Sequence, residues 1–285
     1  MTTRSPDSIE SESIFASREI AERWHRGKAH RAEISNPANE MMLDLANLRP
    51  GDRVLDVAAG TGDQTILAAR RVGLRGSILA IDLSASMLNL AAEAARNGGL
   101  TNIATRVMDA ENIDFDADSF DAVICRMGLM LLSNPVKALI GMRRVVKPRR
   151  KVAVLVLSSE EKNPFLGIPL AIVRCLAKIS SSENGQRGAF ALSNPGALED
   201  AYRRAGFTDV AIHTASMQRR FASSSEAVQI MKEFFSPFVL RDLLAKLSAE
   251  EQDRAWIEIE RQLGRFENPH DVEIPGEALI GVGAK

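Results

Sequence analysis

The chain has 285 residues, of which 45% are hydrophobic and 26% are charged, so it can bury a sizeable core as one large domain or as a domain with an insertion. Its 36 basic and 37 acidic residues give a formal net charge of −1, which excludes the strong positive field typical of general nucleic-acid binders. With two cysteines and no apolar run of about 18 residues, neither a disulfide framework nor a membrane span is expected, and we expect a cytoplasmic protein.

The N-terminal region predicts a short tail followed by helices. Residues 1–12 are polar, lack the apolar segment of a signal peptide and are expected to be a disordered tail. A helical pattern runs from residue 14 to about residue 34 and is expected to break at Asn36-Pro37, before a second helix over 38–48. Together, residues 13–48 predict an N-terminal helical cap.

Residues 49–158 predict an α/β core that binds a ligand. Apolar runs such as VLDVA, AVIC and VAVLVL do not alternate in polarity, which is typical of strands buried on both faces of a parallel sheet. The expected elements are strand 53–58, helix 62–72, strand 77–82, helix 84–97, strands 103–108 and 120–127, helix 135–145 and strand 152–157. The expected caps are Ser84 and Asn134-Pro135. Repeated strand–helix units predict a doubly wound fold, with ligand at the carboxyl ends of the strands.

The remaining chain predicts two helical lids inserted into this core. We expect a lid insertion at 159–195, a core helix and strand at 196–214, a helical lid insertion at 215–275 in which Ser248 caps the last helix, and a final core strand at 276–285. The cap and both lids are expected to build an acceptor site. Their apolar residues include Phe165, Leu166, Ile168, Phe190, Met217, Met231, Phe234, Phe235 and Phe238. These apolar residues favour a small or lipophilic acceptor over a folded RNA.

The turn Ala59-Gly60-Thr61-Gly62 follows the first core strand and opens a helix. Glycine is needed where backbone passes close to a ligand or takes a positive φ, and a helix N-terminus attracts an anion or a carboxylate. The dinucleotide fingerprint needs a third glycine where this chain has Thr65. The turn therefore disfavours a dinucleotide without excluding one.

Acidic residues end the next two strands. Asp82 lies about 20 residues after the turn, where a carboxylate can accept two ribose hydroxyls; the alternative is a turn aspartate that caps the next helix. The third strand ends in Asp109-Ala110-Glu111, where a side chain can accept from an exocyclic amine such as that of adenine. Together with the turn, these residues favour an adenosine-containing ligand.

The segments VLDVAAGTGDQT, ILAIDLSASML, RVMDAENIDF, SFDAVICRMGLML and RRVVKP follow one another in this order. This series resembles the class I S-adenosylmethionine-dependent methyltransferases, and most of all the ubiquinone/menaquinone-biosynthesis C-methyltransferase (methyltransferase type 11) group, over about residues 35–158. The resemblance implies a Rossmann-like methyltransferase fold: a doubly wound, mostly parallel seven-stranded sheet with helical lid insertions. It also implies S-adenosyl-L-methionine as the cofactor.

The resemblance assigns roles to individual residues. Asp56 and the glycine turn would flank the methionine part, Asp82 would take the ribose hydroxyls, and Leu83, Met87, Asp109 and Ala110 would surround the adenine. The expected cofactor-binding residues are Asp56, Ala58, Gly60, Thr61, Gly62, Gln64, Asp82, Leu83, Met87, Asp109, Ala110 and Arg126. Arg126 departs from the small polar residue frequent in the family, and it could pair with the cofactor carboxylate.

A second departure is Lys147-Pro148-Arg149-Arg150, where the family usually has Lys-Pro-Gly-Gly. The family glycines make a tight turn, so this turn must be built differently. We interpret the basic run as a solvated turn and not as a nucleic-acid patch.

The resemblance implies an enzyme that transfers a methyl group in one in-line displacement, with no covalent enzyme intermediate. The protein's task is to align the reactants and to exclude water. We assign no catalytic residue: His25, in the cap, is the histidine best placed to act as a general base, and it stays unassigned. No spaced Cys/His set predicts a metal site.

The leading hypothesis is a methyltransferase acting on a small, lipophilic or aromatic molecule, with no nucleic-acid partner and with a homodimer left open. One alternative is a catalytically idle module that binds S-adenosylmethionine. The other is an NAD-dependent oxidoreductase, which Thr65 and the acidic strand ends disfavour.

Overall fold

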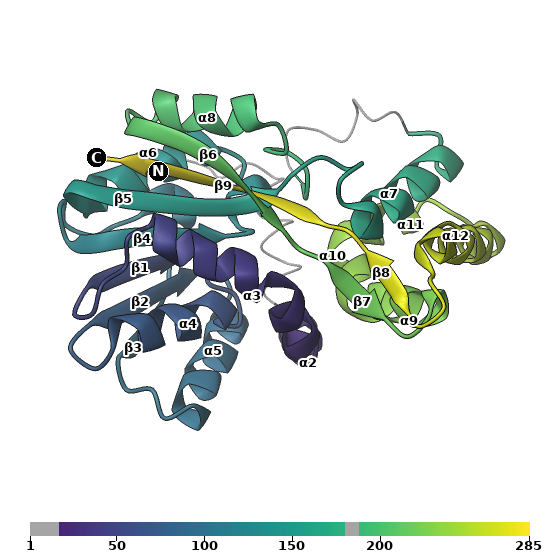
Figure 1. Cartoon of the computed structure of the whole chain (residues 1–285), viewed down its shortest axis with the longest axis horizontal. Coiled ribbons are helices and arrows are strands. Elements are labelled where there is room, and N and C mark those ends of the chain that lie inside the picture. Colours follow the sequence, from purple (N-terminus) through teal and green to yellow (C-terminus); the bar gives the residue numbers. More distant parts are fainter. Residues whose placement is uncertain (1–16, 180–187) are drawn as a thin grey trace.

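The computed structural model describes residues 17–179 and 188–285, so the predicted tail at 1–12 lies outside the described residues. Its centre is a seven-stranded sheet in the order β3-β2-β1-β4-β5-β9-β6 (Figure 1). The strands are β1 (Arg53–Val57), β2 (Ser77–Asp82), β3 (Ile103–Val107), β4 (Phe120–Arg126), β5 (Val146–Leu157), β6 (Thr208–Ser216) and β9 (Glu277–Ala284). Neighbouring strands from β3 to β5 pair in parallel, whereas β9 is antiparallel to both β5 and β6. The predicted doubly wound, mostly parallel seven-stranded sheet is confirmed.

Helices cover both faces of the sheet because its central strands are apolar on both sides. One layer contains α3 (Lys28–Leu45), α4 (Asp63–Val72) and α5 (Ala85–Asn97). The other contains α6 (Pro135–Val145) and α8 (Pro195–Arg204), which contact each other. Between these layers the side chains of β1, β4 and β5 are almost fully buried, and they form the centre of the core. The buried sheet therefore holds the carboxyl ends of its strands in fixed positions.

Local sequence signals set several helix starts as predicted. The Ser84 hydroxyl accepts from the amide of Met87 and begins α5. Asn134 caps α6, and Pro135 occupies its first turn. Ser248 makes a reciprocal capping box with Glu251 at the start of α12 (Ala249–Leu263). The cap side chains satisfy amides that lack helical partners, so these boundaries follow from a few adjacent residues.

The predicted break at Asn36-Pro37 is wrong. Pro37 lies inside α3, and the chain breaks instead at Gly27, between α2 (Arg18–Arg26) and α3. A Cβ at Gly27 would lie 3.0 Å from both the Phe234 ring and Arg31 Nη1, so a side chain there would crowd the lid and α3. Pro37 removes only one helical hydrogen bond, and burial of the following turns, including Met42 and Leu43, outweighs that loss.

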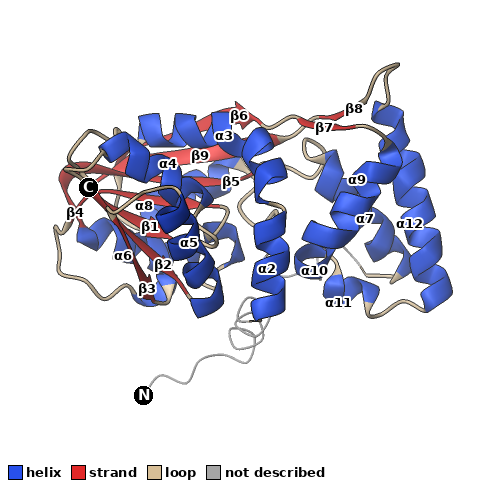
Figure 2. Ribbon diagram, turned by 90° about the horizontal axis from the view of Figure 1, so that it is seen from below, coloured by secondary structure: helices blue, strands red, loops and turns tan. Residues whose placement is uncertain are grey.

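Two segments of the chain form a lid beside the sheet: one follows β5, and the other lies between β6 and β9. β6 leads into β7 (Arg219–Phe221), and β8 (Val272–Ile274) leads back into β9; β7 and β8 form an antiparallel pair (Figure 1). The lid helices are α7 (Pro164–Leu176), α9 (Ser224–Ile230), the π-helix η4 (Met231–Phe235), α10 (Ser236–Val239), α11 (Arg241–Leu244) and α12. The β7–β8 pair was not predicted. α2 lies between core and lid and contacts both α5 and η4 (Figure 2).

The basic residues at the start of β5 form ion pairs with acidic residues at the starts of β1 and β4. Arg150 pairs with Asp52 at 2.7 Å and with Asp121 at 3.0 Å, and Lys147 pairs with Asp121 at 2.9 Å. Arg149 takes a φ of +63°, the left-handed conformation that glycine usually supplies. The turn is thus built differently from a glycine turn, and two of its basic side chains are partly buried ion-pair partners, not simply solvated as interpreted from sequence.

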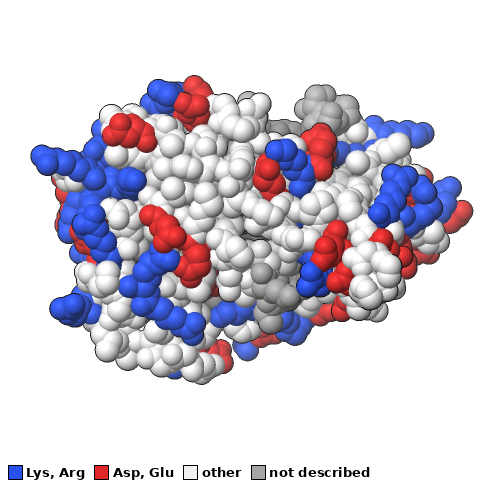
Figure 3. Space-filling view, in the orientation of Figure 1, with Lys and Arg blue, Asp and Glu red and all other residues white. Residues whose placement is uncertain are grey.

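Charge is dispersed over the face shown in Figure 3, where basic and acidic side chains lie interspersed around a broad uncharged area. Within the described residues, no helix is long and apolar enough to cross a membrane.

Candidate functional site

A cavity of about 680 Å³ lies between the carboxyl ends of the core strands and the lid. The core contributes the turns after β1, β2 and β4, and the cap contributes residues of α2 and α3. The lid contributes an apolar wall that includes Leu166, Leu170, Phe190, Met217, Phe235 and Phe238. Nine of the predicted cofactor residues line this cavity: Ala58, Gly60, Thr61, Gln64, Asp82, Leu83, Met87, Ala110 and Arg126.

The glycine turn after β1 has the backbone that its sequence predicts. Gly60 and Gly62 take φ values of +56° and +82°, and Ala58 takes +55°. A Cβ built at Gly60 would meet no atom within 4 Å, because this position faces the cavity. At Gly62 it would come within 2.9 Å of the Ala91 Cβ, so this glycine lets α4 pack closely on α5. The two glycines therefore serve different purposes: one opens the cavity and the other packs two helices.

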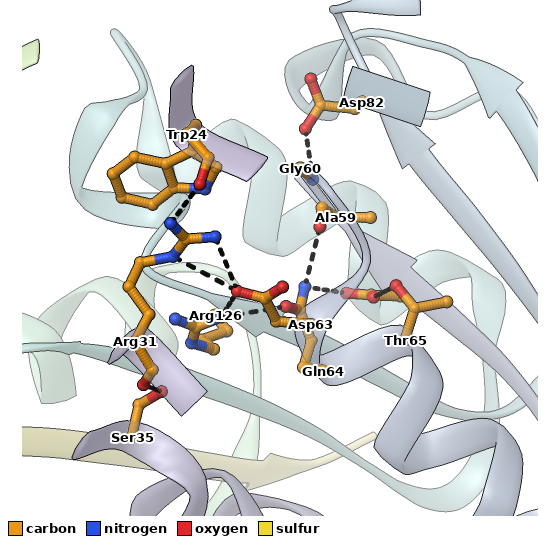
Figure 4. A network of polar contacts seen from close by, with 11 residues as sticks. Trp24, Arg31, Ser35, Ala59, Gly60, Asp63, Gln64, Thr65, Asp82 and Arg126 are labelled. Atoms are coloured by element: carbon orange, nitrogen blue, oxygen red, sulfur yellow. Dashed lines mark hydrogen bonds and ion pairs between the residues drawn. The ribbon is translucent and has the colours of Figure 1, made fainter. Parts of the chain in front are cut away.

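Asp82 at the end of β2 holds the two adjoining turns and also lines the cavity. Its Oδ2 accepts from the amide of Gly60 at 2.9 Å, and its Oδ1 accepts from the amide of Ser84 at 2.9 Å (Figure 4). Burial raises the pKa of this carboxyl despite those hydrogen bonds. A carboxylate oxygen can accept more than one hydrogen bond, so each oxygen keeps the capacity to accept a ligand hydroxyl.

Asp56 lies beneath the turn and not in the cavity wall. Its side chain is fully buried, and it accepts from Gln64 Nε2 at 2.9 Å and from Thr65 Oγ1 at 2.5 Å. Gln64 does line the cavity. Asp56 therefore holds Gln64 in position and supports the turn from below. Burial raises the pKa of Asp56 to about 7, although the bonds from Thr65 and Gln64 oppose this shift.

This raised pKa predicts that the protein loses stability as the pH rises from mildly acidic to neutral. The folded state binds the Asp56 proton more tightly than the unfolded chain does, so the free energy of unfolding falls as pH rises from about 4 to 7. Asp56→Asn removes that titration. We therefore expect the free energy of unfolding of the variant to increase relative to that of the wild type as pH rises over this range. Urea unfolding at several pH values measures it; a difference independent of pH would contradict the prediction.

Three charged residues from separate elements meet beside the glycine turn (Figure 4). Asp63, the first residue of α4, pairs with Arg31 of α3 at 3.1 Å and with Arg126 of β4 at 3.6 Å. Burial alone would raise the pKa of Asp63, but the two guanidinium groups outweigh it and hold the pKa below its usual value. Arg31 also donates to the carbonyl of Trp24 and stacks over its ring at 4.0 Å. The cluster thus attaches the cap to the turn.

Some hydrogen-bond donors and acceptors in and beside this cluster are unpaired among the described residues. Two arginines share one carboxylate, which leaves a net positive charge in the cavity wall. Three buried polar atoms here have no hydrogen-bond partner among the described residues: Thr61 Oγ1, Asp63 Oδ1 and Arg126 Nε. Buried polar atoms are rarely left unpaired, so these atoms indicate a ligand with both acidic and basic groups.

Asp109 and Ala110 are placed differently from each other. Ala110 lines the cavity, as does Met108. The Asp109 carboxylate instead caps a short 3-10 turn, where it accepts from the amide of Glu111 at 2.9 Å and from Asn112 Nδ2 at 2.6 Å. Asp109, Asp56 and Gly62 are the three predicted cofactor residues that do not line the cavity. The adenine role of Asp109 stays a prediction.

Sequence reasoning missed several residues of this site. Arg31, Asp63 and Arg219 line the cavity, and none was singled out. Asp63 directly follows the glycine turn, which was the available signal; Arg31 and Arg219 carry no local motif. His25, the favoured histidine, does not line the cavity, and its Nδ1 is buried with no hydrogen-bond partner among the described residues. No group of three or more His, Cys, Asp or Glu side chains within the described residues could hold a metal ion.

The sequence is similar to a known protein family and to several of its members. Residues 33–169 match the ubiE/COQ5 methyltransferase family. The chain is 40% identical over 117 residues to the ubiquinone/menaquinone biosynthesis C-methyltransferase UbiE of Methylococcus capsulatus, a match that covers 41% of this chain and 47% of the relative. The chain therefore spans about half the length of the curated relatives it matches.

Solved structures extend the similarity of fold beyond this region. A putative methyltransferase from Bacillus halodurans superimposes with a TM-score of 0.58 at 18% identity, covering 87% of this chain and 98% of the other. A Haemonchus contortus phosphoethanolamine N-methyltransferase 2, in complex with phosphomonomethylethanolamine and S-adenosylhomocysteine, gives 0.57 at 19% identity, covering 94% and 60%. The sequence match bears out the resemblance to the UbiE type of S-adenosylmethionine-dependent methyltransferases over residues 33–169, and the solved structures confirm the fold.

Proposed function

We propose that this protein is a methyltransferase that uses S-adenosylmethionine to methylate a small, lipophilic or aromatic acceptor held under the lid. The observation that carries the proposal is the pairing of Gly60 and Asp82 at one end of a 680 Å³ cavity. Gly60 leaves room for close backbone approach, and Asp82 keeps the capacity to accept from two hydroxyls. That combination fits a ribose bound against a glycine turn.

The charged cluster fits the amino-acid end of the same cofactor. A methionine moiety has one carboxylate and one ammonium group. Arg126 Nε is a donor without a partner, and Asp63 Oδ1 is an acceptor without one, so the two atoms match these groups in sign. Arg31, which pairs with Asp63 and donates to the Trp24 carbonyl, would keep α2 and α3 closed over the turn. The residues present therefore fit this cofactor.

Methyl transfer asks little covalent chemistry of the protein. Bound S-adenosylmethionine would supply a methyl group activated by a sulfonium. The contribution of this chain is to orient the ligand through Asp82, to fix the turn through Asp56 and Gln64, and to exclude water with the lid. Trp24 helps to close the cavity, since its ring contacts Phe238 at 4.9 Å between centroids. No general base is assigned, because only an acceptor that must lose a proton needs one.

The apolar lid wall supports a lipophilic acceptor. Phe235, Phe238, Met217 and Leu166 present carbon surface to the cavity opposite the glycine turn. An aromatic or aliphatic acceptor would gain roughly 25 cal/mol for each Å² of apolar surface removed from water there. Polar polymers would gain little from such a wall.

Isothermal titration with S-adenosylmethionine and, separately, with NAD tests the first step. We expect saturable binding of S-adenosylmethionine and no response to NAD. Tight binding of NAD without any response to S-adenosylmethionine would overturn the proposal in favour of an oxidoreductase.

Transfer of a labelled methyl group tests the second step. The protein is incubated with methyl-labelled S-adenosylmethionine and a metabolite extract, and we expect label in an organic-soluble small molecule. Persistent cofactor binding without any labelled product would instead identify a catalytically idle binding module.

A further inference from the structure

Arg219 is a buried cation in the cavity wall that the proposed chemistry does not use. It is the first residue of β7, only 6% of its surface is exposed, and it lines the lid side of the cavity. Its Nε and Nη1 are buried and have no hydrogen-bond partner in residues 17–179 and 188–285. Burial lowers the pKa of Arg219 to about 10, and no nearby carboxylate offsets that effect.

The other arginines in the cavity wall differ from Arg219 in one respect: each has an acidic partner. Arg31 and Arg126 share Asp63, Arg174 pairs with Glu160 at 2.8 Å, and Arg241 pairs with Asp242 at 3.1 Å. Within the described part of the chain, no carboxylate lies within ion-pair distance of Arg219. Its guanidinium lies over the Phe165 ring, at 5.0 Å from the ring centroid, and Nη1 lies beside Gly276.

An unpaired buried guanidinium destabilises a folded protein. Removing a charge from water is unfavourable unless an opposite charge or hydrogen bonds compensate, and one cation–π contact replaces only part of the lost hydration. A structural role would be served as well by an apolar residue of similar size. The arrangement is explained if the missing partner is an anion that arrives in the cavity.

We propose that Arg219 binds an anionic oxygen group of the acceptor, so that the substrate class is a lipophilic molecule with an acidic head, such as a carboxylic acid. This inference rests on the proposed function, because it assigns the acceptor of that reaction. The guanidinium fork matches a planar carboxylate, and Leu166, Phe235 and Met217 in the cavity wall match an apolar body. Arg219 would orient the acceptor from the side opposite the glycine turn.

Two fluorescent probes test the charge preference of the cavity. 1-Anilinonaphthalene-8-sulfonate is an apolar anion, and N-phenyl-1-naphthylamine has the same rings without the sulfonate. Both are titrated into protein saturated with S-adenosylhomocysteine, so that the acceptor side remains available. Arg219→Met should lower the affinity for the anionic probe about 10-fold or more and change that for the neutral probe less than about 2-fold.

Arg220→Met is the matched control. Arg220 is the next residue of β7, is exposed, and pairs with Glu273 and Asp271, so this change removes the same charge outside the cavity. Neither probe should respond to it. The proposal fails if Arg219→Met leaves the affinity for the anionic probe unchanged, if it weakens both probes equally, or if Arg220→Met has the same effect.

Thermal unfolding separates a binding role from a structural one. Because Arg219 lacks a partner, Arg219→Met should preserve or raise the Tm; a lower Tm with equal loss of both probes would identify a packing role and overturn the proposal. If that variant does not fold, competition on the wild-type protein decides. Decanoate should displace the anionic probe at lower concentration than decanol does, and equal displacement would overturn the assignment.

This assignment and the proposed function fail separately. If S-adenosylmethionine binds to the wild type and to Arg219→Met while neither probe distinguishes them, only the anion assignment is overturned. If the probes behave as expected but titration detects no S-adenosylmethionine, the anion site stands and methyl transfer is overturned.

Discussion

Replacing Gly60 with valine is expected to abolish binding of S-adenosylmethionine, with a loss of at least about 100-fold in affinity. The space in front of the Gly60 Cα belongs to the cavity, and no protein atom lies within 4 Å of a Cβ placed there. The valine side chain would therefore occupy the volume where the ligand must approach the backbone. Isothermal titration measures the loss.

Strain alone must be separated from this blockage, because valine at a φ of +56° is itself unfavourable. Gly99 offers the control: it has a φ of +68°, also faces open space, and lies at the far end of α5, outside the cavity. Each valine variant should cost roughly 1–3 kcal/mol of stability through backbone strain. Only the Gly60 variant should lose the cofactor, and retained affinity in that variant would remove the basis of the site.

Asp82→Ala is expected to weaken binding of S-adenosylmethionine by about 1.5–3 kcal/mol, which corresponds to roughly 10- to 150-fold. The variant removes the acceptors for the ribose hydroxyls. It also leaves the amide of Gly60 without its carboxylate partner, so the turn itself becomes less well held. Titration calorimetry of the folded variant measures the change.

Asp114→Ala provides the matched removal of one negative charge. Asp114 is exposed, does not line the cavity, and lies in the loop after the third strand. Its replacement should leave the affinity unchanged within about 2-fold, since an exposed charge is screened by solvent. If both aspartate variants bind the cofactor as tightly as the wild type, Asp82 only holds the turns at Gly60 and Ser84 and the ribose role is wrong.

Local sequence signals were enough to predict several features of the fold. The strands were predictable because their apolar runs must be buried on both faces, and several helix starts because side chains such as Ser84 and Ser248 satisfy nearby amides. The glycine turn was predictable because its backbone needs positive φ. Each of these signals acts over a few residues, so it can be read without knowing the fold.

The helix break at Gly27 could not be predicted from such local signals. Proline is a strong local signal, and it pointed to Asn36-Pro37. The break lies instead at Gly27, which packs beside Phe234, more than 200 residues away in the chain. The β7–β8 pair was hidden for a similar reason. Its strands are three residues each, too short for a visible alternation, and they pair only because β6 and β9 bring them together.

By itself, the sequence determined the class of fold, the position of the glycine turn and the acidic residues that follow it, since each depends on local backbone chemistry and on burial. The tertiary structure decided which of those residues reach the cavity. It set Asp56 beneath the turn, made Asp109 a local cap and joined Arg31 and Arg126 through Asp63. It also left Arg219 without an acidic partner in the part of the chain that the structure describes. Charges on distant segments acquire or lack partners only when the chain is folded, so no local pattern could reveal them.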